Sequence, residues 1–152
     1  MKLIKFTLLF TLISNLFIFA HASEITVVTD PHQKALGPYS HATIANGFLF
    51  ASGVIAIDPK TGQIFGNNVK DQTRQVFDNI RSVLAAGGAT LNDVVKVTVF
   101  LKNPEDFPAM NEVYTEYFTT YKPARTTVPG VEWGHGILVE IVVIAVLPKS
   151  EK

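Results

Sequence analysis

The stretch ILVEIVVIAVL, residues 137–147, decides the fold of this chain. Its side chains alternate between the two faces of a strand, and both faces are apolar except at Glu140. A strand that is apolar on both faces must be covered on both faces. Two helices cannot cover both sides of such a sheet, so we expect other copies of the chain to cover the second face.

The segments before it carry shorter strand signals. Two apolar runs, residues 41–45 and 48–52, are separated by Asn46-Gly47, which is a strong hairpin signal. The Pro, Thr and Gly of residues 58–62 suit a second turn. Residues 94–101 alternate valine and leucine with Lys, Thr and Phe, and this period predicts another strand.

Two helices are expected between these strands. Apolar residues of the segment 69–86 recur at three- and four-residue steps, and Gly87-Gly88 supplies the carboxyl cap. A second helix opens at Asn103 or Glu105 and is stopped by Lys122-Pro123. Its inner side is formed by Phe107, Met110, Val113, Tyr114, Tyr117 and Phe118.

A short strand at residues 124–128 and a glycine-rich loop at residues 130–136 lead into the final strand. The predicted order is β-β-β-α-β-α-β-β, which is typical of an α/β fold. A chain of 152 residues without repeats suits one domain around one core.

The amino end has the pattern of a targeting segment. Lys2 and Lys5 precede a nearly unbroken apolar run, residues 6–20, and Ala20-His21-Ala22 fits a small-x-small cleavage site. The run is shorter than a membrane span and contains polar residues, which favours cleavage over an uncleaved anchor. We therefore predict a signal peptide at 1–22, a domain at 23–152, and an exported protein, periplasmic or secreted, without stable membrane association.

Charge and composition exclude several classes of function. Without Lys2 and Lys5, the 13 basic residues fall to 11 against 13 acidic ones, a formal charge of −2. Nucleic-acid partners are not expected, because their binders depend on a basic surplus. The absence of cysteine excludes thiol nucleophiles and zinc-thiolate sites, and the four histidines show no metal-ligand spacing, so no metal is expected.

Arg125 is the first candidate for chemistry. It lies on a predicted apolar strand, where a guanidinium needs an anionic partner. The planar fork of arginine binds a carboxylate through two parallel hydrogen bonds. The partner is either an internal acid such as Glu140 or the carboxylate of a small ligand, and composition leaves both open.

Glu140 is the second candidate. An ionised carboxylate on an otherwise apolar strand is costly to bury, so such a group is paired, hydrated or retained for function. Beside a water and a bound substrate it would serve as a general base or acid. The alternative is a carboxylate at the end of the strand that faces solvent.

Other polar residues are weaker candidates for the walls of a pocket. Tyr39 follows a Gly-Pro turn, and Ser52-Gly53 ends a strand where a ligand could approach the backbone. Asn111 lies on the inner side of the second helix, where its amide could orient a ligand. Taken alone, Tyr39 and Ser52-Gly53 are better explained by ordinary turn chemistry, and an asparagine on a helix surface is as common as one that orients a ligand. His135 in the glycine-rich loop is a poor candidate for a general base.

Taken in order, seven segments resemble the Rid family of reactive intermediate deaminases, also called the YjgF family. The resemblance covers almost all of the chain after residue 22. It is carried by GPYS at 37–40, FASG at 50–53, DPKTG at 58–62, VKVTVFL at 95–101, MNEVY at 110–114, PART at 123–126 and VEI at 139–141.

The resemblance implies a chorismate-mutase-like α/β fold assembled as a homotrimer, with sites at the subunit interfaces. It also implies the arginine-containing, RidA-type branch, whose marker is matched by Arg125. Members of this branch hydrolyse enamines and imines such as 2-aminoacrylate and 2-iminobutanoate to 2-oxo acids and ammonia. The expected partner is therefore a small imino or 2-oxo acid, and no cofactor is required.

The resemblance also implies roles for individual residues. Arg125 would clamp the substrate carboxylate, and Glu140, with the backbone carbonyl of Thr127, would position the water. Family members often carry cysteine where this chain has Thr127, so a thiol role is excluded here while a carbonyl role survives. The pocket would be lined by Tyr39, Ser52, Gly53 and Asn111.

Two other functions remain as alternatives. A non-catalytic binder of 2-oxo acids from the same family would have the same sequence features. A ribonuclease activity has been claimed for some relatives, but a charge of −2 and the lack of a histidine pair argue against it.

Overall fold

The computed structural model of the chain describes residues 24–148. The signal peptide predicted at 1–22 lies outside the described residues. No helix within residues 24–148 is both long enough and apolar enough to cross a membrane.

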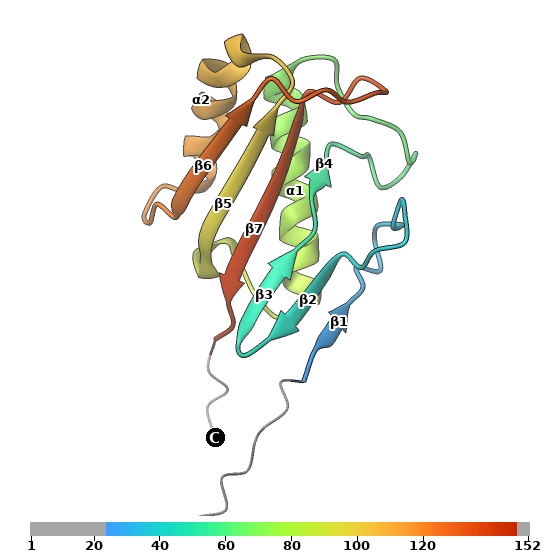
Figure 1. The fold of residues 1–152 in the computed structure, drawn as a ribbon, viewed down its shortest axis with the longest axis vertical. Coiled ribbons are helices and arrows are strands. Elements are labelled where there is room, and N and C mark those ends of the chain that lie inside the picture. The colour runs from blue at the N-terminus through green and yellow to red at the C-terminus, as the bar shows by residue number, and fades with distance from the viewer. Residues whose placement is uncertain (1–23, 149–152) are drawn as a thin grey trace, which may run out of the picture.

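One mixed sheet forms the front layer of the domain (Figure 1). Its strand order is β1-β2-β3-β7-β5-β6, and the short β4 pairs with β7 beside β3. The pairing of β5 with β6 is parallel, and the other pairs are antiparallel. The strands are β1 (Thr26–Val28), β2 (Ala42–Ala45), β3 (Phe48–Ala51), β4 (Val54–Ile55), β5 (Val94–Leu101), β6 (Ala124–Pro129) and β7 (Val139–Val146).

The predicted hairpin is confirmed as β2 and β3. Asn46 and Gly47 both have positive φ angles, 51° and 78°, as the two central residues of a type I′ hairpin turn require. The predicted turn at residues 58–62 is closed by a bridge between Ile57 and Ile64. Strand β1 was not predicted, because three residues are too few to show an alternating pattern.

Two α-helices form the second layer. Helix α1 (Val69–Ala86) has the predicted bounds, and the side chain of Asn68 caps it by accepting the Asp71 backbone N–H at 3.0 Å. Gly88 takes the left-handed conformation after its end, with φ of 78°. Helix α2 (Phe107–Tyr117) begins later than expected, because a 3-10 turn, Pro104–Asp106, precedes it.

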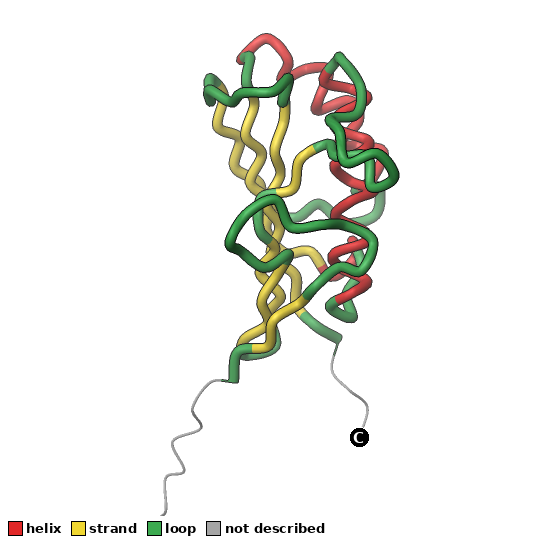
Figure 2. Tube along the Cα trace, turned by 90° about the vertical axis from the view of Figure 1, so that its right-hand side faces the viewer, coloured by secondary structure: helices red, strands yellow, loops and turns green. Residues whose placement is uncertain are grey.

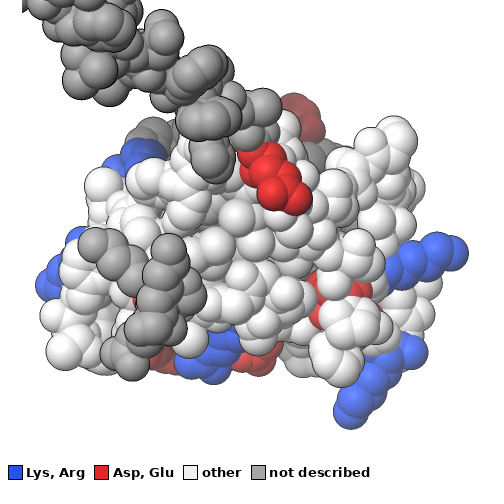
Figure 3. Space-filling view, turned by 90° about the horizontal axis from the view of Figure 1, so that it is seen from below, with Lys and Arg blue, Asp and Glu red and all other residues white. Residues whose placement is uncertain are grey.

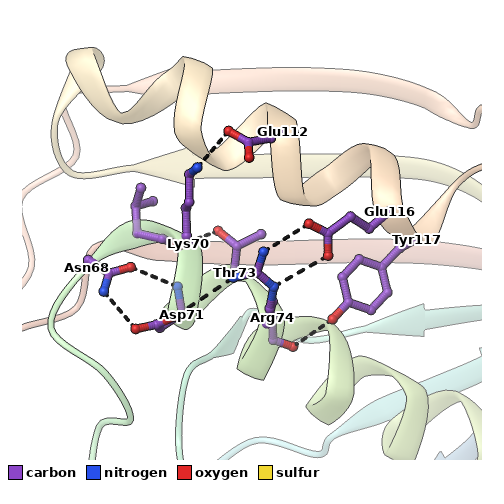
Figure 4. A network of polar contacts seen from close by, with 9 residues as sticks. Asn68, Lys70, Asp71, Thr73, Arg74, Glu112, Glu116 and Tyr117 are labelled. Carbon is purple, nitrogen blue, oxygen red and sulfur yellow. Dashed lines mark hydrogen bonds and ion pairs between the residues drawn. The ribbon is translucent and has the colours of Figure 1, made fainter.

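Ion pairs and a hydrogen bond join the two helices along their exposed side (Figure 4). Lys70 of α1 pairs with Glu112 of α2 at 2.7 Å, and Arg74 pairs with Glu116 at 2.9 Å. The Tyr117 hydroxyl donates to the backbone carbonyl of Arg74 at 3.4 Å. Exposed pairs of this kind contribute little to stability, and the helices are held mainly by the buried core.

Both helices lie on the same face of the sheet, and no helix of residues 24–148 covers the other face (Figure 2). The core lies between the helices and the sheet. Its fully buried side chains include Val76, Phe77, Ile80 and Leu84 of α1 and Val97, Val99, Ile141 and Val143 of the central strands. The observed α/β architecture confirms the predicted fold class.

The helix-free face of the sheet is apolar and exposed. Register places the side chains of Val27, Phe48, Phe50, Val128 and Val146 on it, and each is at least 37% exposed. We call the helix-free side the open face of the sheet.

Charged side chains at the end of the domain near the β2–β3 hairpin are scattered and form no single basic patch in that view (Figure 3).

Candidate active site

Arg125 lies on the edge strand β6 and points toward the helices. It pairs with Val97 of β5, whose buried side chain faces the helix layer, and register partners point to the same face. The guanidinium carbon of Arg125 lies 4.4 Å from the ring centroid of Tyr114 and 5.6 Å from that of Phe107, both on α2. Two aromatic rings therefore hold this cation.

Arg125 makes no ion pair and no side-chain hydrogen bond with any residue in the range 24–148. The four ion pairs found there involve Lys70, Arg74 and Arg81 as cations. The internal pair between Arg125 and Glu140, left open by the sequence, does not form in this chain. The in-plane N–H donors of Arg125 are thus available to an external anion.

Asn111 lies in the same pocket as Arg125. The pocket is lined by Asn111, Tyr114, Thr115, Phe118, Lys122, Pro123 and Arg125. Two cations and an amide but no acidic side chain line it, which favours an anionic ligand. The structure therefore brings two of the predicted site residues together, and we call this group the arginine half-site.

Glu140 points away from the helices. Its strand neighbours Val139 and Ile141 are buried under the helix layer, so alternation places Glu140 on the open face. A Cβ atom built on Gly53 would lie 2.6 Å from Cδ of the Glu140 carboxyl group. Gly53 therefore provides the space that the carboxyl group occupies.

Partial burial raises the pKa of the Glu140 carboxyl group, because desolvation disfavours its charged form. No ion pair with Glu140 is present among the described residues. A carboxyl group in this state has a pKa nearer to neutrality, which suits proton transfer to or from a water molecule.

Tyr39, Ser52 and Gly53 line one pocket together with the loop that follows β1. The Ser52 hydroxyl donates to the Ser40 carbonyl at 2.7 Å, which ties this loop to the end of β3. Tyr39 is 48% exposed. The Glu140 side chain occupies the space beside Gly53. We therefore group Glu140 with these three residues and call the four the glutamate half-site.

Thr127 belongs to the arginine side. It pairs with Val99 of β5, two residues beyond Arg125, and is half-buried. Strand β5 separates it from Glu140 on β7, a backbone separation on the order of 10 Å across two strand spacings. Within one chain, Thr127 and Glu140 therefore lie on strands that are not neighbours.

The predicted site residues therefore fall into two groups, whose charged members, Arg125 and Glu140, point to opposite faces of the sheet. Sequence reasoning missed the role of Tyr114, which it assigned to the core. The signal was its spacing of three residues from Asn111, which places both on one side of α2. Within the described residues, no group of three or more His, Cys, Asp or Glu side chains could hold a metal.

Three similar proteins of other organisms carry names that bear on function. The chain is 52% identical over 119 residues to a RutC family protein of Pyrococcus horikoshii, covering 78% of this chain and 94% of that one. It is 45% identical to the chloroplastic Reactive Intermediate Deaminase A of Arabidopsis thaliana, over 66% and 54% of the two chains. It is 38% identical to a 2-iminobutanoate/2-iminopropanoate deaminase of Dermatophagoides farinae, over 75% and 89%.

Solved structures share the fold. A protein of unknown function from the conserved Rid family of Yersinia pestis superposes with a TM-score of 0.78 at 41% identity, covering 82% of this chain and all of that one. TdcF of E. coli, solved with bound serine, superposes with a TM-score of 0.74 at 31% identity, covering 81% and 99%.

The prediction of a periplasmic protein with a signal peptide has to be corrected. The apolar run that motivated it lies outside the described residues, and the match to the family model begins only at residue 30. The location named among these relatives is the chloroplast, not the periplasm. An apolar amino-terminal run is a composition signal and does not by itself establish export.

A family model gives the same assignment over nearly the whole described chain. The model described as Endoribonuclease L-PSP matches residues 30–147, from the loop before Tyr39 to the end of β7. Both half-sites lie inside that range. The chain belongs to this family, the YjgF or Rid family, as its resemblance in seven segments predicted.

Proposed function

We propose that this protein hydrolyses small 2-imino acids, and their enamine tautomers, to 2-oxo acids and ammonia. One observation carries the proposal: Arg125 lines a pocket with Asn111 and has no anionic partner among the described residues. The names of two relatives, a reactive intermediate deaminase and a 2-iminobutanoate/2-iminopropanoate deaminase, support it.

In the proposed reaction, Arg125 binds the substrate carboxylate and orients the imine carbon. Water adds to the C=N bond, and the resulting amino alcohol loses ammonia to give the C=O bond of the 2-oxo acid. The overall change consumes one water and requires no redox partner. Glu140 accepts a proton from the water and returns it to the leaving nitrogen, for which its raised pKa is suited.

We further propose that the complete site forms between copies of the chain. Arg125 and Glu140 point to opposite faces of one sheet, so a second copy is needed to place a Glu140 near an Arg125. The exposed apolar residues of the open face, including Phe50 and Val146, supply a surface for that contact. A homotrimer with three equivalent sites satisfies this need, because a closed ring repeats one heterologous contact.

The direct test is turnover of an imine generated in situ. An amino-acid oxidase acting on 2-aminobutanoate supplies 2-iminobutanoate, and the appearance of 2-oxobutanoate is compared with and without the protein. We expect a clear acceleration, reduced at least ~30-fold in Arg125→Ala, because loss of the clamp removes about 2 kcal/mol of transition-state stabilisation. Arg74→Ala is the matched control, since Arg74 binds Glu116 on the outer side of α1.

Two outcomes would contradict the proposal. If the protein bound 2-oxobutanoate saturably but accelerated none of the imines supplied, it would be a binding protein of the same family. If it degraded RNA and Arg125→Ala did so equally after further purification, the name of the family model would describe the activity better.

A further inference from the structure

The aromatic surroundings of Arg125 carry an inference beyond the clamp itself. Tyr114 is 6% exposed, and its ring lies under the guanidinium group at 4.4 Å from the Arg125 carbon. A cation at this distance from a buried ring is held by the ring's negative face. A contact with a ring face takes up none of the guanidinium hydrogen bonds, and no ion pair among the described residues uses them.

The ring of Tyr114 is fixed by its neighbours. It packs edge-on against Phe77 of α1, at 5.7 Å between ring centroids, and at a tilt of 38° against Phe118, at 4.9 Å. The Tyr114 hydroxyl is buried and finds no hydrogen-bond partner among the described residues. Burial raises the pKa of this hydroxyl, with Arg125 acting in the opposite direction, so the ring stays neutral.

Arg81 and Tyr117 provide an internal comparison. The guanidinium carbon of Arg81 lies 4.8 Å from the Tyr117 ring, one helical turn from Tyr114, but Arg81 also pairs with Asp78. Arg125 has the aromatic contact without the acid. The chain therefore contains two arginine–tyrosine contacts. Arg81 also has an acidic partner, whereas Arg125 has none among the described residues.

We propose that Tyr114 is a positioning residue that holds the Arg125 guanidinium group in place for a carboxylate, through its ring and not through its hydroxyl. This inference rests on the role of Arg125 in the proposed function. An acid in place of the ring would hold Arg125 equally well but would occupy the donors that the substrate needs. An aromatic platform orients the cation without competing for its hydrogen bonds.

The test compares three variants of the full-length protein, Tyr114→Leu, Tyr114→Phe and Tyr117→Leu. The ligand is 2-oxobutanoate, the expected product, and its Kd is measured by calorimetry. Tyr114→Leu should raise Kd by ~10-fold, as expected for loss of one partly desolvated cation–π contact. Tyr114→Phe keeps the ring and should bind as the wild type does, with an equal or higher Tm because an unpartnered buried hydroxyl is removed.

Tyr117→Leu controls for general damage to the aromatic cluster. It removes a ring stacked on Phe77 at 4.3 Å and should lower Tm, but it should leave the Kd of 2-oxobutanoate unchanged. A Tyr114→Leu variant that bound 2-oxobutanoate as tightly as the wild type would overturn the inference. So would equal losses of affinity in Tyr114→Leu and Tyr117→Leu, or a loss in Tyr114→Phe as large as in Tyr114→Leu.

A second measurement separates this inference from the proposed function. A stacked guanidinium shows a ring-current shift of the Arg125 Nε–H and Cδ–H resonances in NMR spectra without any ligand. The shift should persist in Tyr114→Phe and fall sharply in Tyr114→Leu, where only the more distant ring of Phe107 remains. If the wild type shows the ring-current shift but converts no imine, the proposed function is wrong and the positioning role of Tyr114 remains. If the wild type shows no such shift, the positioning role of Tyr114 is wrong, whatever the activity.

Discussion

The two half-sites differ in how the fold holds their charged groups. Arg125 is held from outside the sheet, by aromatic rings on α2, and its donors are unoccupied among the described residues. Glu140 is held within the sheet, in the space left by Gly53, and is partly desolvated without a cation. Each half-site lacks the charge that the other carries. Under the proposed function, each chain therefore supplies both parts of a site, and a complete site needs a second copy.

Mixing two inactive variants tests this separation with the largest expected effect. Arg125→Ala and Glu140→Gln should each be nearly inactive as homogeneous proteins. When the two chains are co-expressed and assembled together, we expect roughly a quarter of the wild-type deaminase activity, because random neighbours combine one intact half-site from each chain at that frequency.

The readout is 2-oxobutanoate formation by the mixed assembly, with co-expressed wild type and Arg125→Ala as the control for subunit exchange. Size-exclusion chromatography with light scattering gives the number of chains. A mixed assembly no more active than the average of its two parents would show that both half-sites act within one chain.

Gly53→Ala should break the glutamate half-site without changing any charge. The new methyl group would overlap the Glu140 carboxyl group, and the flexible end of that side chain would move away. We expect a loss of ~10- to 100-fold in kcat, since a misplacement of about 1 Å has effects of this size. Binding of 2-oxobutanoate to Arg125 should change much less, and circular dichroism should confirm an intact fold. Equal losses of kcat and of affinity would mean that Gly53 supports the fold instead.

The pH dependence of stability separates Glu140 from the other acids. The pKa of the Glu140 carboxyl group is raised in the folded chain. The folded state therefore keeps the carboxyl proton at pH values where the unfolded chain has released it. Ionisation of Glu140 therefore costs stability as pH rises through the usual carboxyl range, about pH 4, to the raised pKa. Glu140→Gln carries no such cost.

The measurement is Tm from about pH 4 to pH 8 for both proteins. The advantage of Glu140→Gln over wild type should grow across this window and then level off. A constant difference at all pH values would contradict a raised pKa. Activity of the wild type should fall as pH decreases through the same window, because the base must be ionised.

The smallest effect is expected outside both half-sites, at the start of α1. Asn68→Ala removes the cap on the Asp71 N–H and should lower the free energy of unfolding by ~1 kcal/mol. Deaminase activity should not change. Asn68→Ser keeps a capping oxygen and should restore most of the stability, as measured by urea unfolding. A change in kcat for Asn68→Ala would mean that α1 couples to the site more tightly than the contacts indicate.

Much of the fold could be predicted, because its signals are local. The helix at residues 69–86 has a clear 3.6-residue period, and Asn46-Gly47 specifies its turn through its own backbone preferences. Strand β1 could not be predicted, since it exists through pairing with β2 and not through its own pattern. The 3-10 turn before α2 is likewise a detail of packing.

Candidate residues could be named from the sequence, but their arrangement could not. A lone arginine and a lone glutamate in apolar strands are visible in the sequence because their burial is costly. Their pairing could not be decided, since it depends on which face of the sheet each side chain occupies. Tyr114 was placed in the core by its period, and a period cannot show that a core ring also supports a cation.

The sequence by itself determined the fold class and the identity of the candidate residues, because these follow from local periods, turns and the cost of isolated charges. It indicated the family through the resemblance of seven segments. The tertiary structure decided that Arg125 stands on an aromatic platform facing the helices, that Glu140 fills the space above Gly53, and that the two point to opposite faces. The physical reason is that strand order and register, which are long-range pairings, set the direction of every side chain on the sheet.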